Sequence, residues 1–398
     1  EKADRYYVES NYNLDPDEVN LLGQATLDEI EGEATEFIAL TDYANGNDLA
    51  IDLHYNWVDD QLDINSFVDY FLIQLYVNNR DWPNFNLKVW NAVGHEKWRY
   101  MLYDMDVGLK YNGTGLPEQQ SLAFILNNAV SSNPHVQILE ALLANEGFRR
   151  YFINRYCDLL NTTFDAQAIY ASISDQKEKI ESEMGMHYPK WCGYIASWHE
   201  RFIGQKGFID GRELIIHHEL AEVFELPQAV DLTIDVFPAG AATVQLNSLA
   251  LDEFPFAGSY FNTNVIDLTA EIKLGELFKY WENRRTKERL FELQIQVDPE
   301  DQDEWVVVCH SNEIAEIDIV PNPAENEITV SFSLTSQSPV EISVVDLQGK
   351  DVMSTSYPEF FLRGRHKINM DLSQLLAGHY ILFLTTSYGR EASQIIKL

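Results

Sequence analysis

Positive charge is scarce in this sequence. Its 398 residues include 28 Lys and Arg against 63 Asp and Glu, which gives a formal net charge of −35 at pH 7. A field of this sign repels phosphate backbones, so no nucleic acid is expected as a partner. Long apolar runs are missing too: no stretch approaches the ~20 residues of a transmembrane helix, and no transmembrane segment is predicted. Hydrophobic residues still make up 45% of the chain, so we expect a folded protein of roughly two to four domains.

Cysteine is also rare. The three cysteines, Cys157, Cys192 and Cys309, are far apart, odd in number and without a Cys-x-x-Cys pair, which argues against both a disulfide framework and a zinc site. The sequence begins with Glu1 rather than Met, and no signal peptide precedes this residue. We therefore expect the start to be a processed or truncated end.

Hydrophobic spacing divides the chain into three zones. In residues 1–228, apolar residues recur at intervals of three and four, as from Ile64 to Leu75, which predicts a mostly helical region that contains one β-hairpin. In residues 229–311 the period changes to two, which predicts a small β module. Alternation returns in residues 317–398, where we expect a C-terminal β-sandwich. The predicted fold class is multidomain, α+β and then all-β.

A polar stretch in the first zone carries the candidate chemistry. YVNNRDWPNFNLKVW, residues 76–90, lies between a predicted helix and the predicted hairpin. Asn, Asp and Pro favour turn geometry, so a plain turn is the simplest interpretation. The spacing adds a second one, because Arg80 precedes Asp81 and Asn86 follows five residues later. In protein kinases an Asp in this order orients the acceptor hydroxyl, and an Asn five residues later holds a metal ion.

Two further acidic residues follow the hairpin. Segments 87–90 and 98–103 flank a turn at Gly94, and Asp104 and Asp106 come directly afterwards. Because a hairpin returns the chain close to its start, we expect Asp104 to lie beside the polar loop. Carboxylate and amide oxygens suit Mg²⁺ or Mn²⁺, and phosphoryl transfer needs such a charge. Asp106 shares a face with Asp104 in an extended segment, although such residues also cap turns.

Together these features resemble the spore-coat protein H (CotH) kinase family of atypical secreted protein kinases. The family pattern N-x-D-W-P-x-x-N is matched by residues 79–86, and W-R-x-x-x-x-D-x-D by residues 98–106. "DRYYVESNYNLDPDEVNLL" near the start and the predicted helices to about residue 228 also look like this family.

The resemblance implies transfer of the ATP γ-phosphate to Ser or Thr of a protein substrate. Catalytic roles fall on Asp81, Asn86 and Asp104, and the predicted ligands of Mg²⁺ or Mn²⁺ are Asn86, Asp104 and Asp106. The candidates for contact with the cofactor are Asn79, Arg80 and Arg99. For Arg99 a structural ion pair is equally consistent with its strand position.

The nucleotide-binding half of a kinase centre has no counterpart in this sequence. No Gly-rich loop and no strand Lys with its helix Glu precede Tyr6, and in the family the Lys and Arg that grip the phosphates lie in that part. We therefore expect the chain to carry the metal-binding half of the centre without the nucleotide-binding half. Expressed alone, it is expected to bind divalent metal weakly and ATP scarcely at all.

Two other features have simpler interpretations. The segment His218-Glu219-Leu220-Ala221-Glu222 resembles a zinc-protease helix, but Glu222 stands where H-E-x-x-H has its second His, and a solvated helix face is predicted. The indoles of Trp82 and Trp98 are predicted to be core residues.

The last zone resembles the C-terminal sorting domain of the type IX secretion system. It contains "IDIVPNPAENEITVSF", "VEISVVDLQGKDV" and the terminal "IIKL", with Pro321, Gly349, Gly378 and Tyr380 at the usual landmarks. The resemblance implies contact with the type IX secretion machinery, and a secreted or outer-surface location on a Gram-negative bacterium.

Two functions remain open from the sequence. The first is a secreted CotH-like protein kinase, which the retained Asp81, Asn86 and Asp104 favour. The second is a noncatalytic surface protein that uses the same fold for binding or adhesion.

Overall fold

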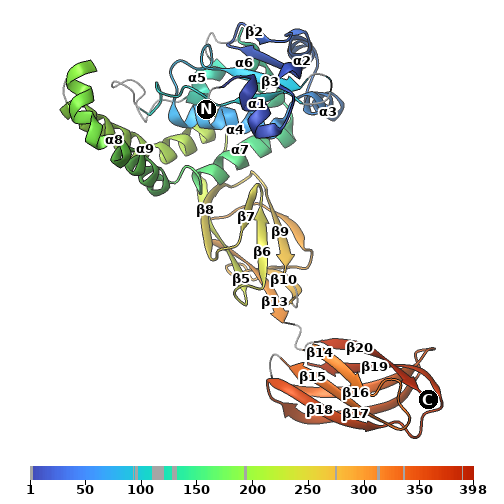
Figure 1. Cartoon of the computed structure of the whole chain (residues 1–398). Coiled ribbons are helices and arrows are strands. Elements are labelled where there is room, and N and C mark those ends of the chain that lie inside the picture. Colours follow the sequence, from blue (N-terminus) through green and yellow to red (C-terminus); the bar gives the residue numbers. More distant parts are fainter. Residues whose placement is uncertain are drawn as a thin grey trace.

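Helices dominate the first part of the chain, and strands alone make up the rest (Figure 1). The computed structural model describes residues 3–92, 94, 97–109, 121–127, 132–191, 195–273, 276–311, 314–334, 337–387 and 389–398, so Glu1 and Cys192 lie outside the described residues. Cys157 and Cys309 are buried free thiols. Among the described helices, none is long and apolar enough to cross a membrane.

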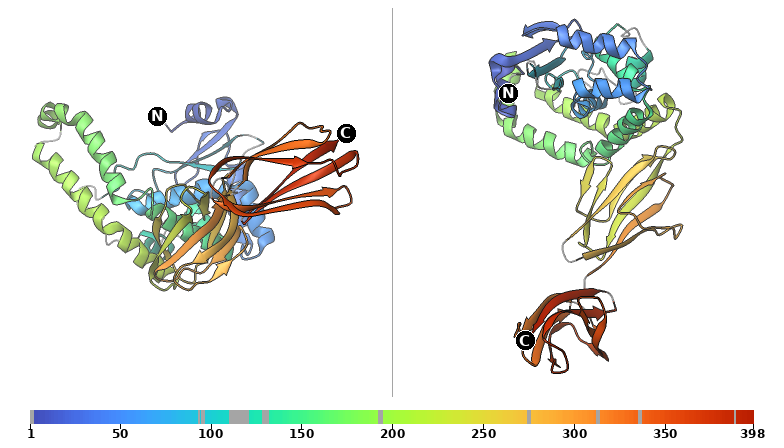
Figure 2. Two further views of the ribbon diagram at one scale, coloured as in Figure 1. Left: turned by 90° about the horizontal axis from the view of Figure 1, so that it is seen from below. Right: turned by 90° about the vertical axis from the view of Figure 1, so that its right-hand side faces the viewer.

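The helical region is built around α4. Its helices are α1 (Arg5–Tyr12), α2 (Thr35–Gly46), α3 (Asp52–Gln61), α4 (Ile64–Val77), α5 (Ser121–Asn127), α6 (Pro134–Leu142), α7 (Glu146–Leu160), α8 (Ala166–Trp191) and α9 (Ile195–Val223), with a 3₁₀ turn at Pro16–Glu18. The Asp63 side chain caps α4 by accepting a hydrogen bond from the Ser66 N–H (3.0 Å). Asn78 ends the helix in the left-handed conformation, with φ of 51°. Figures 1 and 2 show α8 and α9 side by side as a long hairpin.

The predicted hairpin is present, but it belongs to a larger sheet. Its strands β3 (Lys88–Ala92) and β4 (Arg99–Met101) pair with Lys88 opposite Met101. β1 (Val19–Gly23) and β2 (Asp28–Glu31) extend it to an antiparallel sheet in the order β2-β1-β3-β4. The sequence prediction of a hairpin alone was incomplete. All five residues of β1 are buried, so the strand lacks the alternation that reveals a half-exposed strand.

The middle zone consists of two sheets that pack on the helical region. The sheet orders are β11-β10-β13-β5-β8 and β12-β9-β6-β7. The strands are β5 (Ala229–Phe237), β6 (Ala242–Leu246), β7 (Leu249–Leu251), β8 (Phe256–Phe261), β9 (Ile266–Ile272), β10 (Glu276–Asn283), β11 (Arg289–Leu290), β12 (Gln294–Val297) and β13 (Asp303–Ser311). Buried apolar residues of these strands, such as Leu232 and Trp281, belong to the same hydrophobic cluster as those of α4 and α7. The two zones therefore share one core.

Asp158 of α7 joins this core to the middle sheets by polar contacts. Its fully buried carboxylate accepts hydrogen bonds from the Tyr260 hydroxyl (2.8 Å), from Asn247 Nδ2 (3.2 Å), and from both the backbone N–H (3.0 Å) and the hydroxyl of Ser248. Burial raises the pKa of Asp158, while these donors oppose the rise. A buried carboxylate needs such partners, so the donors of the middle zone are required by α7.

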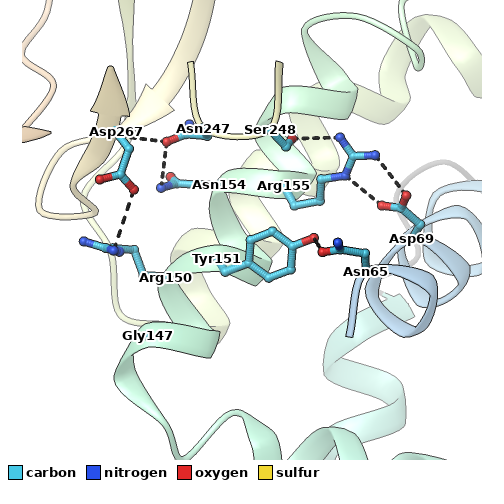
Figure 3. A pocket seen from close by; sticks show the side chains of 10 residues that line it. All are labelled: Asn65, Asp69, Gly147, Arg150, Tyr151, Asn154, Arg155, Asn247, Ser248 and Asp267. Carbon is cyan, nitrogen blue, oxygen red and sulfur yellow. Dashed lines mark hydrogen bonds and ion pairs between the residues drawn. The ribbon is translucent and has the colours of Figure 1, made fainter. Parts of the chain in front are cut away.

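A polar cavity of about 520 Å³ lies beside this contact (Figure 3). On one side, Arg155 of α7 binds both carboxylate oxygens of Asp69 on α4 (2.7 and 2.9 Å) and the Ser248 hydroxyl (2.7 Å). On the other side, Arg150 faces Asp267 of β9 at 3.7 Å. The lining groups hydrogen-bond one another, so the cavity is the polar margin of the contact between α4, α7 and the middle sheets.

The last zone has a separate hydrophobic core between two antiparallel sheets, ordered β14-β15-β18 and β17-β16-β19-β20. Its strands are β14 (Ile314–Val320), β15 (Glu327–Leu334), β16 (Ser338–Asp346), β17 (Asp351–Phe361), β18 (Gly364–Asp371), β19 (Gly378–Thr386) and β20 (Arg390–Lys397). Alternate residues of β15 are buried, as the period-two pattern predicted. The fold is thus mixed α+β at the N-terminal side and all-β afterwards.

His135 is a buried polar link between α6 and the four-stranded sheet. Its Nδ1 lies 2.8 Å from the Tyr100 hydroxyl, and its Nε2 lies 3.3 Å from the carbonyl oxygen of Gln24. The neutral ring with a proton on Nε2 satisfies both partners, since it accepts from Tyr100 and donates to Gln24. Burial lowers the pKa of His135 from 6.5 to about 3.

We predict that His135 makes folding stability fall in acid. The unfolded chain takes up a proton near pH 6.5, whereas folded His135 resists protonation until about pH 3. The free energy of unfolding should therefore lose roughly 4–5 kcal/mol from this residue between these pH values. Urea titrations at several pH values give the free energy of unfolding at each pH. Plotted against pH, this free energy should fall less steeply in acid for His135→Gln than for the wild type. Equal slopes would show that His135 is not held neutral.

Candidate active site

The polar loop after α4 is held in place by hydrogen bonds that other parts of the chain donate to its backbone carbonyl groups. The Tyr70 hydroxyl donates to the carbonyl oxygen of Asn86 (3.1 Å), and Asn133 Nδ2 donates to that of Pro83 (3.0 Å). The turn between β1 and β2 adds two backbone bonds, to the carbonyl oxygens of residues 84 (3.2 Å) and 87 (2.8 Å). The loop is therefore held in one conformation by α4, α6 and the sheet.

The side chain of Asn79 orients the backbone at Asp81. Asn79 is buried, its Nδ2 donates to Gln74 Oε1 (2.9 Å), and its Oδ1 accepts from the Asp81 N–H (3.3 Å). The Asp81 side chain is exposed, and its backbone carbonyl accepts from the N–H of Phe85 (2.9 Å). Asn79 thus supports the loop, which presents the carboxylate of Asp81 to solvent.

The segment that carries Asp104 and Asp106 returns to the start of this loop. The N–H of Leu109 donates to the carbonyl oxygen of Val77 (2.8 Å), the last residue of α4. Gly108 allows this approach, because a Cβ atom at that position would lie 3.0 Å from Cγ2 of Val77. Both ends of the candidate site therefore meet at the C-terminal end of α4.

Asp104 is perturbed by desolvation and by two neighbouring acidic residues. The pKa of Asp104 is raised, first by desolvation, then by the charge of Asp106 and a hydrogen bond with it, and then by the charge of Asp81. Tyr103 is affected in turn, since burial and the charge of Asp104 raise its pKa. Asp106 and Asp81 thus both act on Asp104 with like charge, a repulsion that a bound divalent cation would relieve.

The donor chemistry of this cluster fits Mg²⁺ or Mn²⁺, which prefer oxygen ligands. Within the described ranges, no three His, Cys, Asp or Glu side chains stand in an arrangement that could hold a metal ion. Asn86 adopts φ of 56° and is half-buried, and its backbone carbonyl is the group bound to Tyr70. Metal binding by Asn86, Asp104 and Asp106 stays a prediction.

Family comparison agrees with the sequence motifs. The model of the CotH kinase protein family matches residues 6–215, more than half of the chain. The chain belongs to the CotH kinase family. The model of the secretion system C-terminal sorting domain matches residues 318–398. This sorting domain indicates secretion to the surface of a Gram-negative bacterium of the Bacteroidetes type, and it implies interaction with the type IX secretion machinery.

Comparison with individual proteins adds little to the family match. No match is found among curated proteins. A DUF3823 family protein from Bacteroides uniformis is 10% identical over 43% of this chain and all of its own, with a TM-score of 0.20. Dimeric latent PorU from Porphyromonas gingivalis is 14% identical over 41% of this chain and 16% of its own, with a TM-score of 0.18.

The two arginines predicted to contact the cofactor lie in different places in this CotH-family chain. Arg80 is exposed beside the loop, with its guanidinium carbon 6.0 Å from the ring centre of Phe124. Arg99 forms an ion pair with Asp63 (3.0 Å), the cap at the other end of α4. The helix has 14 residues, so about 20 Å separates its ends. Arg99 therefore occupies the structural ion pair that the sequence left as an alternative.

Two buried residues of α9 were missed by the sequence analysis. Arg212 is fully buried against the C-terminal end of α4, and Glu219 is 2% exposed, with Oε1 accepting from the Ala123 N–H of α5 (3.0 Å). The predicted solvated face holds for His218 and Glu222 but is wrong for Glu219. The available signal was the seven-residue spacing of Arg212 and Glu219, which places both on one face of the helix with Ile216 and Leu220.

The predicted indole positions are confirmed by burial. Trp82 is 6% exposed and packs edge-on against Phe71, with ring centres 5.1 Å apart. Trp98 is 2% exposed and packs in the same way on Phe37 at 5.0 Å. These rings make the loop and the hairpin part of the core.

We predict that Gly108→Ala weakens the return of the acidic segment to α4. The added methyl group crowds Val77 and should lower the free energy of unfolding by about 1–2 kcal/mol. The matched control is Gly46→Ala, which meets open space at the end of α2 and should be neutral or slightly stabilising. Urea denaturation gives the stabilities, and amide shifts of residues 104–106 report the displacement. Identical behaviour of the two variants would contradict the close approach.

Proposed function

We propose that this chain carries the metal-binding half of the reaction centre of a secreted protein kinase, which in its full-length form transfers the γ-phosphate of ATP to Ser or Thr hydroxyl groups of protein substrates. The observation that carries the proposal is the return of the segment with Asp104 and Asp106 to the C-terminal end of α4, where the loop of Asp81 begins, within a CotH-family chain. Family membership suggests the use of ATP. Phosphoryl transfer depends mainly on positioning and charge neutralisation, and an exposed cluster of oxygen ligands next to a fixed loop suits both needs.

Each residue of the cluster has a proposed role. Asp81 accepts a hydrogen bond from the acceptor hydroxyl and orients it, while the Asn79 side chain fixes the backbone of the loop. Asn86, Asp104 and Asp106 are the proposed metal ligands. When bound, Mg²⁺ or Mn²⁺ supplies the positive charge that offsets the phosphate oxygens. Arg80, at the rim, is a candidate for contact with a phosphate.

We predict that Asp104→Ala abolishes metal-dependent labelling of a protein substrate. In the full-length protein with radiolabelled ATP and Mn²⁺ or Mg²⁺, the loss should be about 100-fold or more, because charge neutralisation is removed. The matched control, Asp60→Ala, changes an exposed residue of α3 and should label like the wild type. Unchanged labelling by Asp104→Ala would exclude this residue as an essential ligand. Absence of labelling in the wild type, with folding intact, would favour the noncatalytic surface protein.

We further propose three functional units, residues 1–228, 229–311 and 317–398. The first would hold the reaction centre, the second would support it as a β module, and the third, as a β-sandwich, would serve export alone. The separate hydrophobic core of the last unit supports its independence. The core shared by the first two supports their association.

We predict that removal of residues 317–398 blocks export without changing activity. In the native bacterium the shortened protein should accumulate in the periplasm, because the sorting domain is the part addressed to the secretion machinery. The purified protein should label substrate at the wild-type rate, since the last zone supplies no proposed catalytic residue. Fractionation followed by immunoblotting decides the first part. Normal delivery to the cell surface would contradict the role of the tail.

A further inference from the structure

A fully buried arginine lies directly behind the candidate catalytic loop. Arg212 of α9 is 0% exposed, and it reaches the last turn of α4, more than 130 residues earlier in the chain. Its Nε donates to the carbonyl oxygen of Tyr76 (2.8 Å), and its Nη2 donates to that of Leu75 (2.6 Å). These carbonyl groups belong to the last four of the helix, which have no partners within an α-helix. The guanidinium also carries the charge that suits a helix C-terminus.

The same guanidinium extends its contacts into the loop through a serine. Nη2 of Arg212 donates to Oγ of Ser121 (2.9 Å), at the start of α5. The Ser121 hydroxyl in turn donates to Oδ1 of Asn78 (3.2 Å), which ends α4 and precedes Asn79. Arg212, Ser121 and Asn78 therefore form a buried chain of hydrogen bonds from α9 to the beginning of the loop.

Glu219 connects the same face of α9 to α5. It accepts from the Ala123 N–H, two residues after Ser121, and burial raises its pKa while the charge of Arg212 lowers it. One helix thus holds both the end of α4 and the beginning of α5. Between them lies a small pocket of about 90 Å³, which is lined by Asn78, Asn79, Arg80, Ser121 and Phe124, among others.

We propose that Arg212 is a positioning residue of the kinase centre, which acts through Ser121 to hold the loop of Asp81 and helix α5 in register. The catalytic part of this proposal rests on the proposed function. The structural part, that Arg212 orders the loop, rests on the hydrogen bonds alone. Arg212 is shielded from solvent, so it acts through the groups that it binds. It acts by keeping residues 78–81 from moving relative to the segment that carries Asp104.

Arginine is required here because, among the described residues, at least three acceptors surround one planar group. The Nε and Nη2 donors reach two carbonyl oxygens and a hydroxyl oxygen at fixed angles, and a lysine ammonium at the end of a flexible stem cannot reproduce this fork. Arg212→Lys keeps a positive charge near the helix end but loses part of the fork. Ser121→Ala keeps the bonds of Arg212 to the two carbonyl groups, and it removes both the bond from Nη2 to Ser121 and the link to Asn78.

Hydrogen exchange measures the positioning directly. The Asn78 N–H bonds to the carbonyl of Leu75, the Asn79 N–H to that of Gln74, and the Ala123 N–H to Glu219, so their exchange reports the state of the junction. We expect exchange of residues 78–81 and 121–123 to become at least about tenfold faster in Arg212→Lys and in Ser121→Ala. The matched control is Arg155→Lys, which loosens α4 near Asp69 and should leave residues 78–81 unchanged.

The kinetic arm separates positioning from general stability. If the wild type labels substrate, both variants should lower kcat while the KM for ATP is unchanged, and Arg155→Lys should not. Wild-type exchange rates in Ser121→Ala would overturn the proposal, even if Arg212→Lys fails to fold. So would equal acceleration throughout the chain, because it indicates global unfolding. A wild type without labelling would overturn the proposed kinase function alone, since the exchange rates still decide whether Arg212 orders the loop.

Discussion

The carbonyl groups at the C-terminal end of α4 impose the constraint on which the candidate site depends. This end is buried, so the last four carbonyl oxygens need donors from elsewhere. The residues just after the helix bond to Gln74 and Leu75, Arg212 to Leu75 and Tyr76, and Leu109 to Val77. Each donor comes from a segment important to the site: the polar loop, α9 and the residues after Asp106. Satisfying one helix end therefore brings the polar loop, α9 and the segment after Asp106 to one place.

The negative net charge of the chain is reflected in the acidic residues of the candidate site. Desolvation, and then the charge of Asp106, raise the pKa of Asp104 in the folded chain. Arg212, which supports the start of the loop, is buried and bound to carbonyl oxygens. It stabilises the helix end without offering its charge to the solvent. The exposed charges at this end of the helix include those of Asp81, Asp104, Asp106 and Arg80.

Sequence analysis could find the parts of the site that follow one another in the chain. The five-residue interval from Asp81 to Asn86, the hairpin and the acidic pair after it are local patterns, and the observed pairing of Lys88 with Met101 agrees with them. β1 was missed because a strand buried on both faces carries no alternation. Arg212 was missed because its acceptors lie far away in sequence, and two of them are backbone carbonyl groups, which no residue type reveals. Glu219 was predicted to be exposed because it was compared with a zinc-protease motif together with His218 and Glu222, which are exposed. Its position on the apolar face of α9 was not considered.

The buried carboxylate of Asp158 bears on how this protein can be divided. The change of hydrophobic period near residue 228 suggests a natural boundary, yet the donors to Asp158 all come from beyond it, at Asn247, Ser248 and Tyr260. A chain that ended at the boundary would leave this carboxylate facing water beside an uncovered apolar surface of α7. The helical part is therefore incomplete as a folding unit at the point where its sequence pattern stops. When domains are recombined in evolution, we expect these two parts to be transferred together, because they share a core. The C-terminal sheets have their own core and can be exchanged separately.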